Sequence, residues 1–252
     1  MPTKGLAVVT GASRGLGREL ALALAREGYD LLVCARGLEG LEALKRDAEA
    51  LGVDCQLWQA DLQRHGGNFM RALCVRSVQV LINNASDVHA LKPLEELSGQ
   101  DCFQVFSLNF DITFFLMRAV LPGMRARGSG TIVNICSLAG RRAIRNASIY
   151  CASKFALRGL TESVAQELEG SGVACFSASP GGMNTSMREQ LFHDAAQQQD
   201  PAVVAQIIVD AIAGRILMPQ GWDLVIRGSE YITMSPERWT GITMSYGQGV
   251  RA

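Results

Sequence analysis

The feature that most constrains the fold is a glycine-rich turn between a strand-like and a helix-like segment near the N-terminus. Gly5 to Thr10 is a short apolar run typical of a buried strand, and TGASRGLG follows from Thr10 to Gly17. The next segment, ELALALAREG, has the composition of a helix. A strand, a glycine-rich turn and a helix in this order are the context of a dinucleotide-binding turn.

Each glycine of this turn has a predicted structural role. Gly11 permits the tight turn, Gly15 lets the backbone approach a pyrophosphate, and Gly17 allows close packing of the helix. The spacing is GxxxGxG rather than the commoner GxGxxG. A helix N-terminus offers free N–H groups and a positive dipole end to phosphate. We expect the other residues of the turn to contact the same ligand, namely Ser13, Arg14 and Leu16.

The end of the second predicted strand indicates which dinucleotide binds. In such folds an acidic residue often holds the adenosine ribose hydroxyls at this point, but the strand 30–35 ends at Ala35 and Arg36 follows. A guanidinium can hold a 2′-phosphate that an acid would repel, and Arg14 could reach the same group. The sequence therefore predicts NADP(H) over NAD(H). The alternative is that Arg36 is a solvated loop residue.

Two further strand ends carry candidate cofactor residues. Asp61 and Leu62 close the strand 53–58, and Asp61 could contact the adenine amino group or simply cap the next helix. The strand 78–82 runs into Asn83 and Asn84, which could hydrogen-bond the backbone beside a cofactor or form a simple turn.

A tyrosine, a lysine and a serine form the candidate catalytic group. Tyr150 and Lys154 are four residues apart, which places both on one face of a helix. Free tyrosine has a pKa of about 10, and we expect the lysine cation to lower it and make the phenol a general acid or base. Ser137 ends a predicted strand, at the sheet edge where open α/β sheets bind ligands.

Composition limits the class of protein. The chain has 252 residues, an apolar fraction of 48% and no formal net charge, so bulk attraction to nucleic acid or an anionic membrane is not expected. No apolar run approaches the ~20 residues of a membrane span. The seven cysteines form no CxxC pair and the three histidines are far apart, which predicts no metal site and a cytoplasmic location.

The order of elements predicts an α/β fold. Strands alternate with helices, which implies a parallel sheet covered on both faces. We expect one domain over residues 1–228, with a polar substrate lid at about 183–200 and a tail at 229–252 of uncertain order. The predicted strands are residues 5–10, 30–35, 53–58, 78–82, 130–135, 173–178 and 222–226.

Six motifs in chain order resemble the short-chain dehydrogenase/reductase family over about residues 4–228. They are TGASRGLG, NNA at 83–85, Asn109, Ser137, YCASK at 150–154 and PGGMNT at 180–185. The resemblance implies a doubly wound, seven-stranded Rossmann fold, and the Ala35–Arg36 pair matches members that prefer NADP. Ser86 departs from the family, which often has glycine there. The implied catalytic set is Ser137, Tyr150, Lys154 and Asn109, and the further implied cofactor contacts are Asn83, Ala85, Tyr150, Lys154, Pro180, Gly181, Met183 and Thr185.

The expected activity is hydride transfer from NADPH to a ketone, an aldehyde or a β-ketoacyl group, with Tyr150 as the acid. Lys154 would also hold the nicotinamide ribose, and Asn109 would position a water that relays protons to Lys154. The alternatives are an alcohol dehydrogenase working in the oxidative direction and a cofactor-binding regulator with little turnover. The basic loop Arg141, Arg142 and Arg145 could favour an anionic or phosphopantetheine-carried substrate or be merely solvated. The family implies a homodimer or homotetramer.

Overall fold

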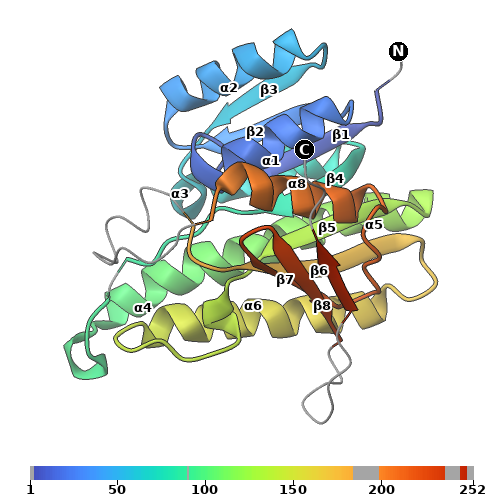
Figure 1. Ribbon diagram of the computed structural model, residues 1–252. Coiled ribbons are helices and arrows are strands. Elements are labelled where there is room, and N and C mark those ends of the chain that lie inside the picture. The colour runs from blue at the N-terminus through green and yellow to red at the C-terminus, as the bar shows by residue number, and fades with distance from the viewer. Residues whose placement is uncertain (1–2, 90, 184–198, 236–244, 249–252) are drawn as a thin grey trace.

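The computed structural model describes residues 3–89, 91–183, 199–235 and 245–248, and its strands form one sheet (Figure 1). The strand order is β3-β2-β1-β4-β5-β6-β7-β8-β9. The strands are β1 (Leu6–Thr10), β2 (Asp30–Ala35), β3 (Cys55–Gln59), β4 (Val78–Asn83), β5 (Gly130–Ile135), β6 (Val173–Pro180), β7 (Asp223–Arg227), β8 (Glu230–Met234) and β9 (Ser245–Gln248).

The first seven strands are parallel, as the sequence predicts. The order reverses between β1 and β4, which is the position where doubly wound sheets bind ligands beyond the strand ends. The tail adds two strands that were not predicted, since β8 pairs with β7 and β9 pairs with β8, both antiparallel. Gly228 has a φ of +67°, which allows the reversal between β7 and β8.

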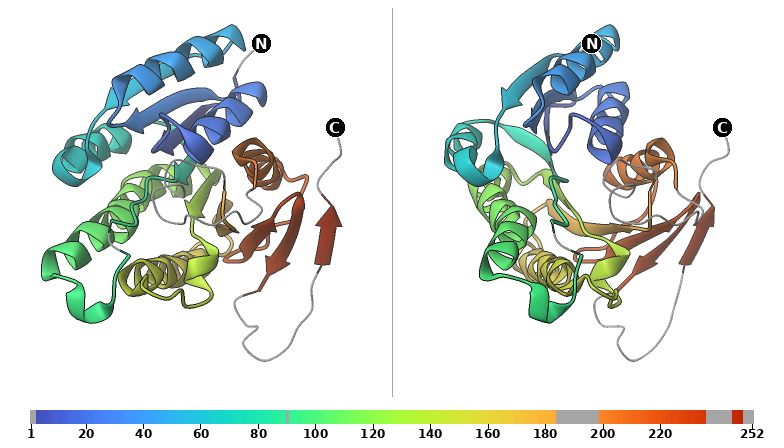
Figure 2. Two further views of the ribbon diagram at one scale, coloured as in Figure 1. Left: turned by 60° about the vertical axis from the view of Figure 1, so that its left-hand side comes forward. Right: turned by 90° about the vertical axis from the view of Figure 1, so that its left-hand side faces the viewer.

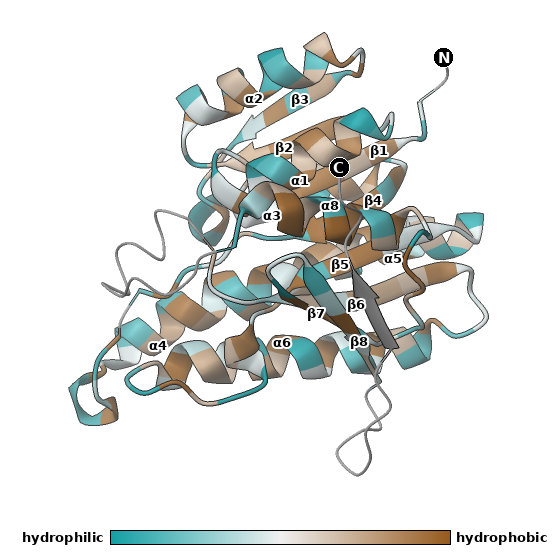
Figure 3. Cartoon of the chain, viewed as in Figure 1, coloured by the Kyte–Doolittle hydropathy of each residue, from teal (hydrophilic) through white to brown (hydrophobic). Residues whose placement is uncertain are grey.

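Helices cover both faces of the sheet (Figure 2). One face carries α1 (Gly15–Arg26), α2 (Leu38–Ala50) and α8 (Pro201–Ile212), and the other carries α3 (Leu62–Cys74), α5 (Ile112–Arg127) and α6 (Ser148–Glu167). Neighbouring residues of β1 alternate between the two layers, with Val9 in the first and Val8 in the second. Most residues of the central strands are therefore hydrophobic (Figure 3).

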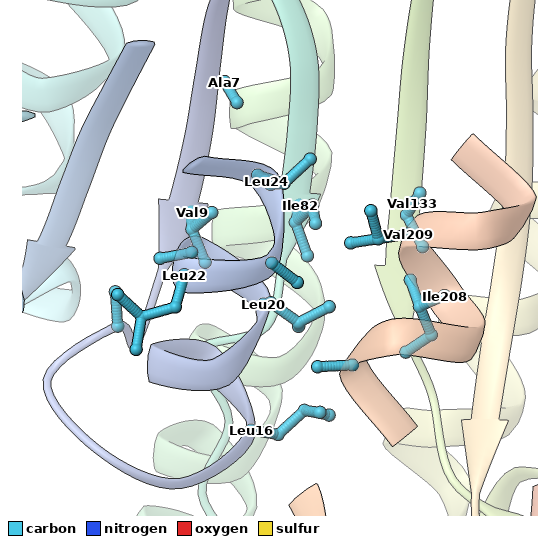
Figure 4. Packing of buried hydrophobic residues seen from close by; sticks show 14 of the residues in the cluster. Ala7, Val9, Leu16, Leu20, Leu22, Leu24, Ile82, Val133, Ile208 and Val209 are labelled. Atoms are coloured by element: carbon cyan, nitrogen blue, oxygen red, sulfur yellow. The ribbon is translucent and has the colours of Figure 1, made fainter. Parts of the chain in front are cut away.

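In the first core layer, α1 packs against α8 on one face of the sheet. Leu16, Leu20 and Leu24 of α1 and Ile208 and Val209 of α8 are buried above the central strands (Figure 4). Because α1 begins at Gly15, this packing fixes its N-terminus above the end of β1. Burial of one such aliphatic side chain contributes about 2 kcal/mol.

One continuous helical stretch runs from Gly99 to Arg127. It comprises α4 (Gly99–Phe106), a π-helical turn (Ser107–Asp111) and α5. By length and composition alone it could cross a membrane, but α5 packs against α3, β4 and β5 as a covering helix does. The stretch is widened at its π-helical turn, which contains Asn109.

Candidate active site

A cavity of about 980 Å³ lies along the carboxyl ends of the parallel strands. One end is lined by the glycine-rich turn and the loop after β2, and the other by Ser137, Tyr150 and Lys154. The predicted dinucleotide turn and the predicted catalytic group therefore share one cavity, whose volume is in the range of small-molecule sites.

The glycine-rich turn depends on two glycines and on Asn84. Gly11 has a φ of +68°, and a Cβ atom on Gly17 would lie 2.3 Å from the Gly11 carbonyl oxygen. Asn84 donates its side-chain amide to the carbonyls of Thr10 (2.9 Å) and Gly11 (3.3 Å). Thr10 Oγ1 in turn accepts the N–H groups of Asn84 and Ala85, each at 3.0 Å. These bonds tie the turn to the end of β4.

The N-terminus of α1 faces the cavity without a side-chain cap. Arg14 occupies the capping position with an extended backbone and makes no capping hydrogen bond. The first N–H groups of a helix have no partner within the helix, so this terminus suits a phosphate. The absence of side chains at Gly11 and Gly17 lets the turn pack closely on itself and on Asn84. With the open helix N-terminus, the turn thus fits a dinucleotide.

Arg14 and Arg36 are both exposed and line the same end of the cavity. Asp61 lines it as well, and its carboxylate accepts the Gln63 N–H at 3.0 Å as the cap of α3. The capping alternative for Asp61 is therefore confirmed. Leu62, the first residue of α3, lies beside it in the lining.

Tyr150 and Ser137 form the reactive pair at the other end. Burial raises the pKa of Tyr150 to about 12, opposed by a hydrogen bond with Ser137. The Ser137 hydroxyl also accepts the Ala139 N–H at 3.1 Å. We expected Lys154 to lower the Tyr150 pKa; for the chain alone this expectation is wrong, because desolvation of the phenolate outweighs the favourable interactions.

Lys154 is held inside the protein. Only 2% of its surface is exposed, and its Nζ donates to the Ile135 carbonyl at 3.0 Å. Nζ lies 5.8 Å from the centre of the Tyr150 ring. Burial lowers the pKa of Lys154 to about 8, because the ammonium loses hydration. The lysine therefore keeps most of its charge at neutral pH and loses it in mildly alkaline solution.

Asn109 lies behind this pair and does not line the cavity. Its Oδ1 accepts the Asp87 N–H (2.8 Å) and the Ser86 hydroxyl (3.0 Å). Its Nδ2 donates to the Asp87 carbonyl (2.9 Å) and to Ser153 Oγ (3.0 Å), and Ser153 donates to the Tyr150 carbonyl at 2.8 Å. The Asn109 side chain thus links the loop after β4 to the helix that carries Tyr150. Its predicted role with a water stays a prediction.

Asn83 differs from the prediction. Its amide donates to Asn134 Oδ1 at 2.8 Å between β4 and β5, and it is absent from the cavity lining, where Asn84 takes its place. Thr185 and the predicted lid lie outside the described residues except for the lid's ends. The other cofactor predictions all line the cavity: Gly11, Ser13, Arg14, Gly15, Leu16, Gly17, Arg36, Asp61, Leu62, Ala85, Tyr150, Lys154, Pro180, Gly181 and Met183.

The three arginines of the basic loop have different surroundings. Arg141 Nε contacts the buried carboxylate of Asp223 at 2.5 Å, which also accepts the hydroxyls of Ser177 and Ser179. Arg141 is therefore held by Asp223, and it does not line the cavity. Arg142 is exposed and lines the cavity, whereas Arg145 is exposed outside it.

Comparison with known proteins agrees with this site. The model of the short chain dehydrogenase family matches residues 5–196. A 3beta-hydroxysteroid dehydrogenase of Mediterraneibacter gnavus is 34% identical, with 77% of this chain and 74% of that protein covered. An NADPH-dependent pterin aldehyde reductase of Arabidopsis thaliana is 32% identical, with 75% and 79% covered.

A solved structure shares the fold over nearly the whole chain. It is a gluconate 5-dehydrogenase of Burkholderia cenocepacia J2315 in complex with NADP and tartrate, with a TM-score of 0.80 and 25% identity. The alignment covers 90% of this chain and 95% of that one. On the family match, these relatives and the Ser137, Tyr150 and Lys154 site, the chain belongs to the short chain dehydrogenase family and is an oxidoreductase that acts on CH–OH groups.

Proposed function

We propose that this protein is an NADPH-dependent carbonyl reductase that converts a ketone or aldehyde into an alcohol. The observation that carries the proposal is that Ser137, Tyr150 and Lys154 lie at one end of a cavity whose other end is the glycine-rich turn. A cofactor that extends from the turn along this cavity would bring its nicotinamide toward the two hydroxyls.

A bound reduced nicotinamide would supply hydride to the carbonyl carbon. The chain's own residues then act on the oxygen. Ser137 donates a hydrogen bond that orients the carbonyl and stabilises the negative charge that develops on it. Tyr150 transfers its phenolic proton to that oxygen, which completes the alcohol. The raised pKa of Tyr150 suits an acid, because the group keeps its proton at neutral pH until a far more basic alkoxide forms.

Lys154 serves this step through its charge. Its ammonium, 5.8 Å from the centre of the Tyr150 ring, favours the phenolate that remains after proton transfer. The same group is available to the ribose hydroxyls of the cofactor. Asn109 and Ser153 hold the backbone at Tyr150 in place, so Asn109 contributes by positioning.

The preference for NADP(H) is supported by Arg14 and Arg36. Both guanidinium groups line the end of the cavity beside the glycine-rich turn, and Ala35 stands where an acidic residue would bind the ribose of NAD. The name of the Arabidopsis relative includes NADPH, and the Burkholderia structure contains NADP.

The same residues serve alcohol oxidation by microscopic reversibility, and this is the alternative direction. A cofactor-binding regulator is the alternative outside enzymes. A screen of NADPH consumption over ketones, aldehydes, quinones and β-ketoacyl thioesters separates them. Steady consumption with any of these supports the reductase, whereas tight NADPH binding without consumption, together with no NADP⁺ reduction by the matching alcohols, favours the regulator.

The assembly expected from the family is a homodimer or homotetramer. Four exposed phenylalanines on α4, α5 and α6 support it, since such side chains are usually covered by another surface. They are Phe103, Phe114, Phe115 and Phe155. Light scattering should give a mass of two or four chains, and a monomer would contradict this. We also propose a cytoplasmic location and a single domain. The expected boundary at residue 228 is too early, because β8 and β9 continue the same sheet.

A further inference from the structure

The catalytic tyrosine is set into an apolar wall. Its ring packs, with Leu91 and Ile144, against a small buried cluster of Ala139, Ala147 and Cys151. Leu91, Ile144 and Ala147 also line the cavity, as do Val88 and Leu138. The surface that meets the part of a substrate next to its carbonyl group is therefore largely hydrocarbon.

Charged side chains are unevenly distributed along this cavity. Arg14, Arg36, Glu39 and Asp61 line the end at β1, β2 and β3. At the catalytic end, beyond β4 and β5, the charged lining residues in the described part of the chain are Lys154 and Arg142. Lys154 is buried and bonded to the Ile135 carbonyl, which leaves Arg142 as the cation open to a substrate.

The position of Arg142 is fixed by its backbone. Its N–H donates to the Leu138 carbonyl at 3.1 Å, and its carbonyl lies 4.0 Å from Cys151 Sγ, within hydrogen-bonding range of a thiol. The neighbouring cations are placed differently. Arg141 pairs with Asp223, and Lys92 Nζ pairs with Asp101 at 3.1 Å. No described residue forms a hydrogen bond or an ion pair with the Arg142 guanidinium.

We propose that the substrate is an amphiphilic acid, a carbonyl compound with an apolar body and an anionic group that Arg142 binds. The inference rests on the proposed reductase activity and adds the substrate class. Apolar walls favour a hydrocarbon body, and they penalise a polyol, whose hydroxyls would lose water without gaining partners. A guanidinium at the rim is suited to a carboxylate, a sulfate or a phosphate, since it offers paired donors to two oxygens.

The test compares each keto acid with its own methyl ester, in short-, medium- and long-chain versions. The two substrates of a pair share the ketone and the apolar body and differ in the anionic group. We expect the wild-type protein to prefer the acid of at least one pair in kcat/KM. In Arg142→Ala the acid-to-ester ratio of kcat/KM should fall on the order of tenfold, as expected for the loss of one charge-assisted hydrogen bond.

Arg145→Ala is the matched control. It removes an exposed arginine of the same loop, but Arg145 does not line the cavity. Its acid-to-ester ratio should equal that of the wild type. Arg142→Lys keeps a charge but loses the fork of donors, so its ratio should lie between the wild type and Arg142→Ala. Equal ratios in wild type and Arg142→Ala, or the same fall in Arg145→Ala, would overturn the proposal.

Different results would contradict the reductase activity and the acidic substrate class. Turnover of neutral esters with no preference for the acids would remove the substrate class and leave the reductase intact. Absence of NADPH consumption with every acid, ester and other carbonyl compound would remove the reductase itself, and the substrate class with it.

Discussion

The ammonium of Lys154 lies 5.8 Å from the centre of the Tyr150 ring, one helical turn further along α6, and donates to the main-chain carbonyl of Ile135 at 3.0 Å. The end of β5 therefore positions the charge beside the phenol. Burial shifts the two pKa values in opposite directions, to about 12 for Tyr150 and about 8 for Lys154. Near neutral pH the site holds a protonated phenol next to a mostly protonated amine.

These pKa values predict how carbonyl reduction depends on pH. Tyr150 keeps the proton that it must donate throughout the range below its pKa of about 12. Lys154 has a lowered pKa, so it becomes neutral as the pH rises through about 8 and no longer stabilises the phenolate. The kcat/KM for reduction should therefore fall above about pH 8, as a pH profile at saturating NADPH can measure.

Lys154→Arg provides the control for this assignment, because a guanidinium keeps its proton over the whole range. Whatever activity the variant retains should show no fall near pH 8. An unchanged alkaline limb in Lys154→Arg would assign the fall to another group.

Cofactor preference should depend on Arg36. Replacing it with alanine removes a guanidinium that can bond a 2′-phosphate, and one or two charge-assisted bonds correspond to roughly a 10- to 100-fold change. The ratio of kcat/KM for NADPH to that for NADH should fall by this factor in Arg36→Ala. Arg46→Ala, an exposed change in α2 away from the cavity, should leave the ratio unaltered. A wild-type protein that uses both cofactors equally would refute the assignment.

Arg141 should matter for stability rather than for substrate binding. Asp223 is 1% exposed, and Arg141→Ala would leave its carboxylate buried with two serine hydroxyls as partners. Breaking a buried ion pair from one side costs about 3–5 kcal/mol. Urea denaturation should show a loss of that order in Arg141→Ala and little change in Arg145→Ala. A variant of full stability with a raised KM for anionic substrates would instead make Arg141 a binding residue.

Much of the fold could be predicted from the sequence because its signals are local. The apolar run Leu6–Thr10 is followed by glycines whose geometry restricts the turn, and periodic apolar residues mark the helices. The strands β8 and β9 could not be predicted in this way. They are short, and they pair with an edge that only the folded sheet provides.

In the candidate site, too, local features could be predicted and contacts between distant residues could not. Residues that lie on one element, such as Tyr150 and Lys154, were predicted from their spacing. The hydrogen bonds from the Asn84 side chain to the glycine-rich turn could not be predicted, because they join residues more than 70 positions apart. The contact of Arg141 with Asp223 could not be predicted, because the two residues are 82 positions apart. The direction of the Tyr150 pKa shift was wrong because burial depends on the whole fold.

The most direct test of the account is the Tyr150→Phe variant, which removes one hydroxyl and keeps the ring in its apolar wall. Loss of a general acid corresponds to roughly a 10²- to 10⁴-fold decrease in rate. The account predicts a fall of that size in kcat for NADPH oxidation with the best carbonyl substrate, while the Kd for NADPH, measured by fluorescence titration, stays close to that of the wild type. A kcat near the wild-type value would contradict the assignment of Tyr150 as the proton donor.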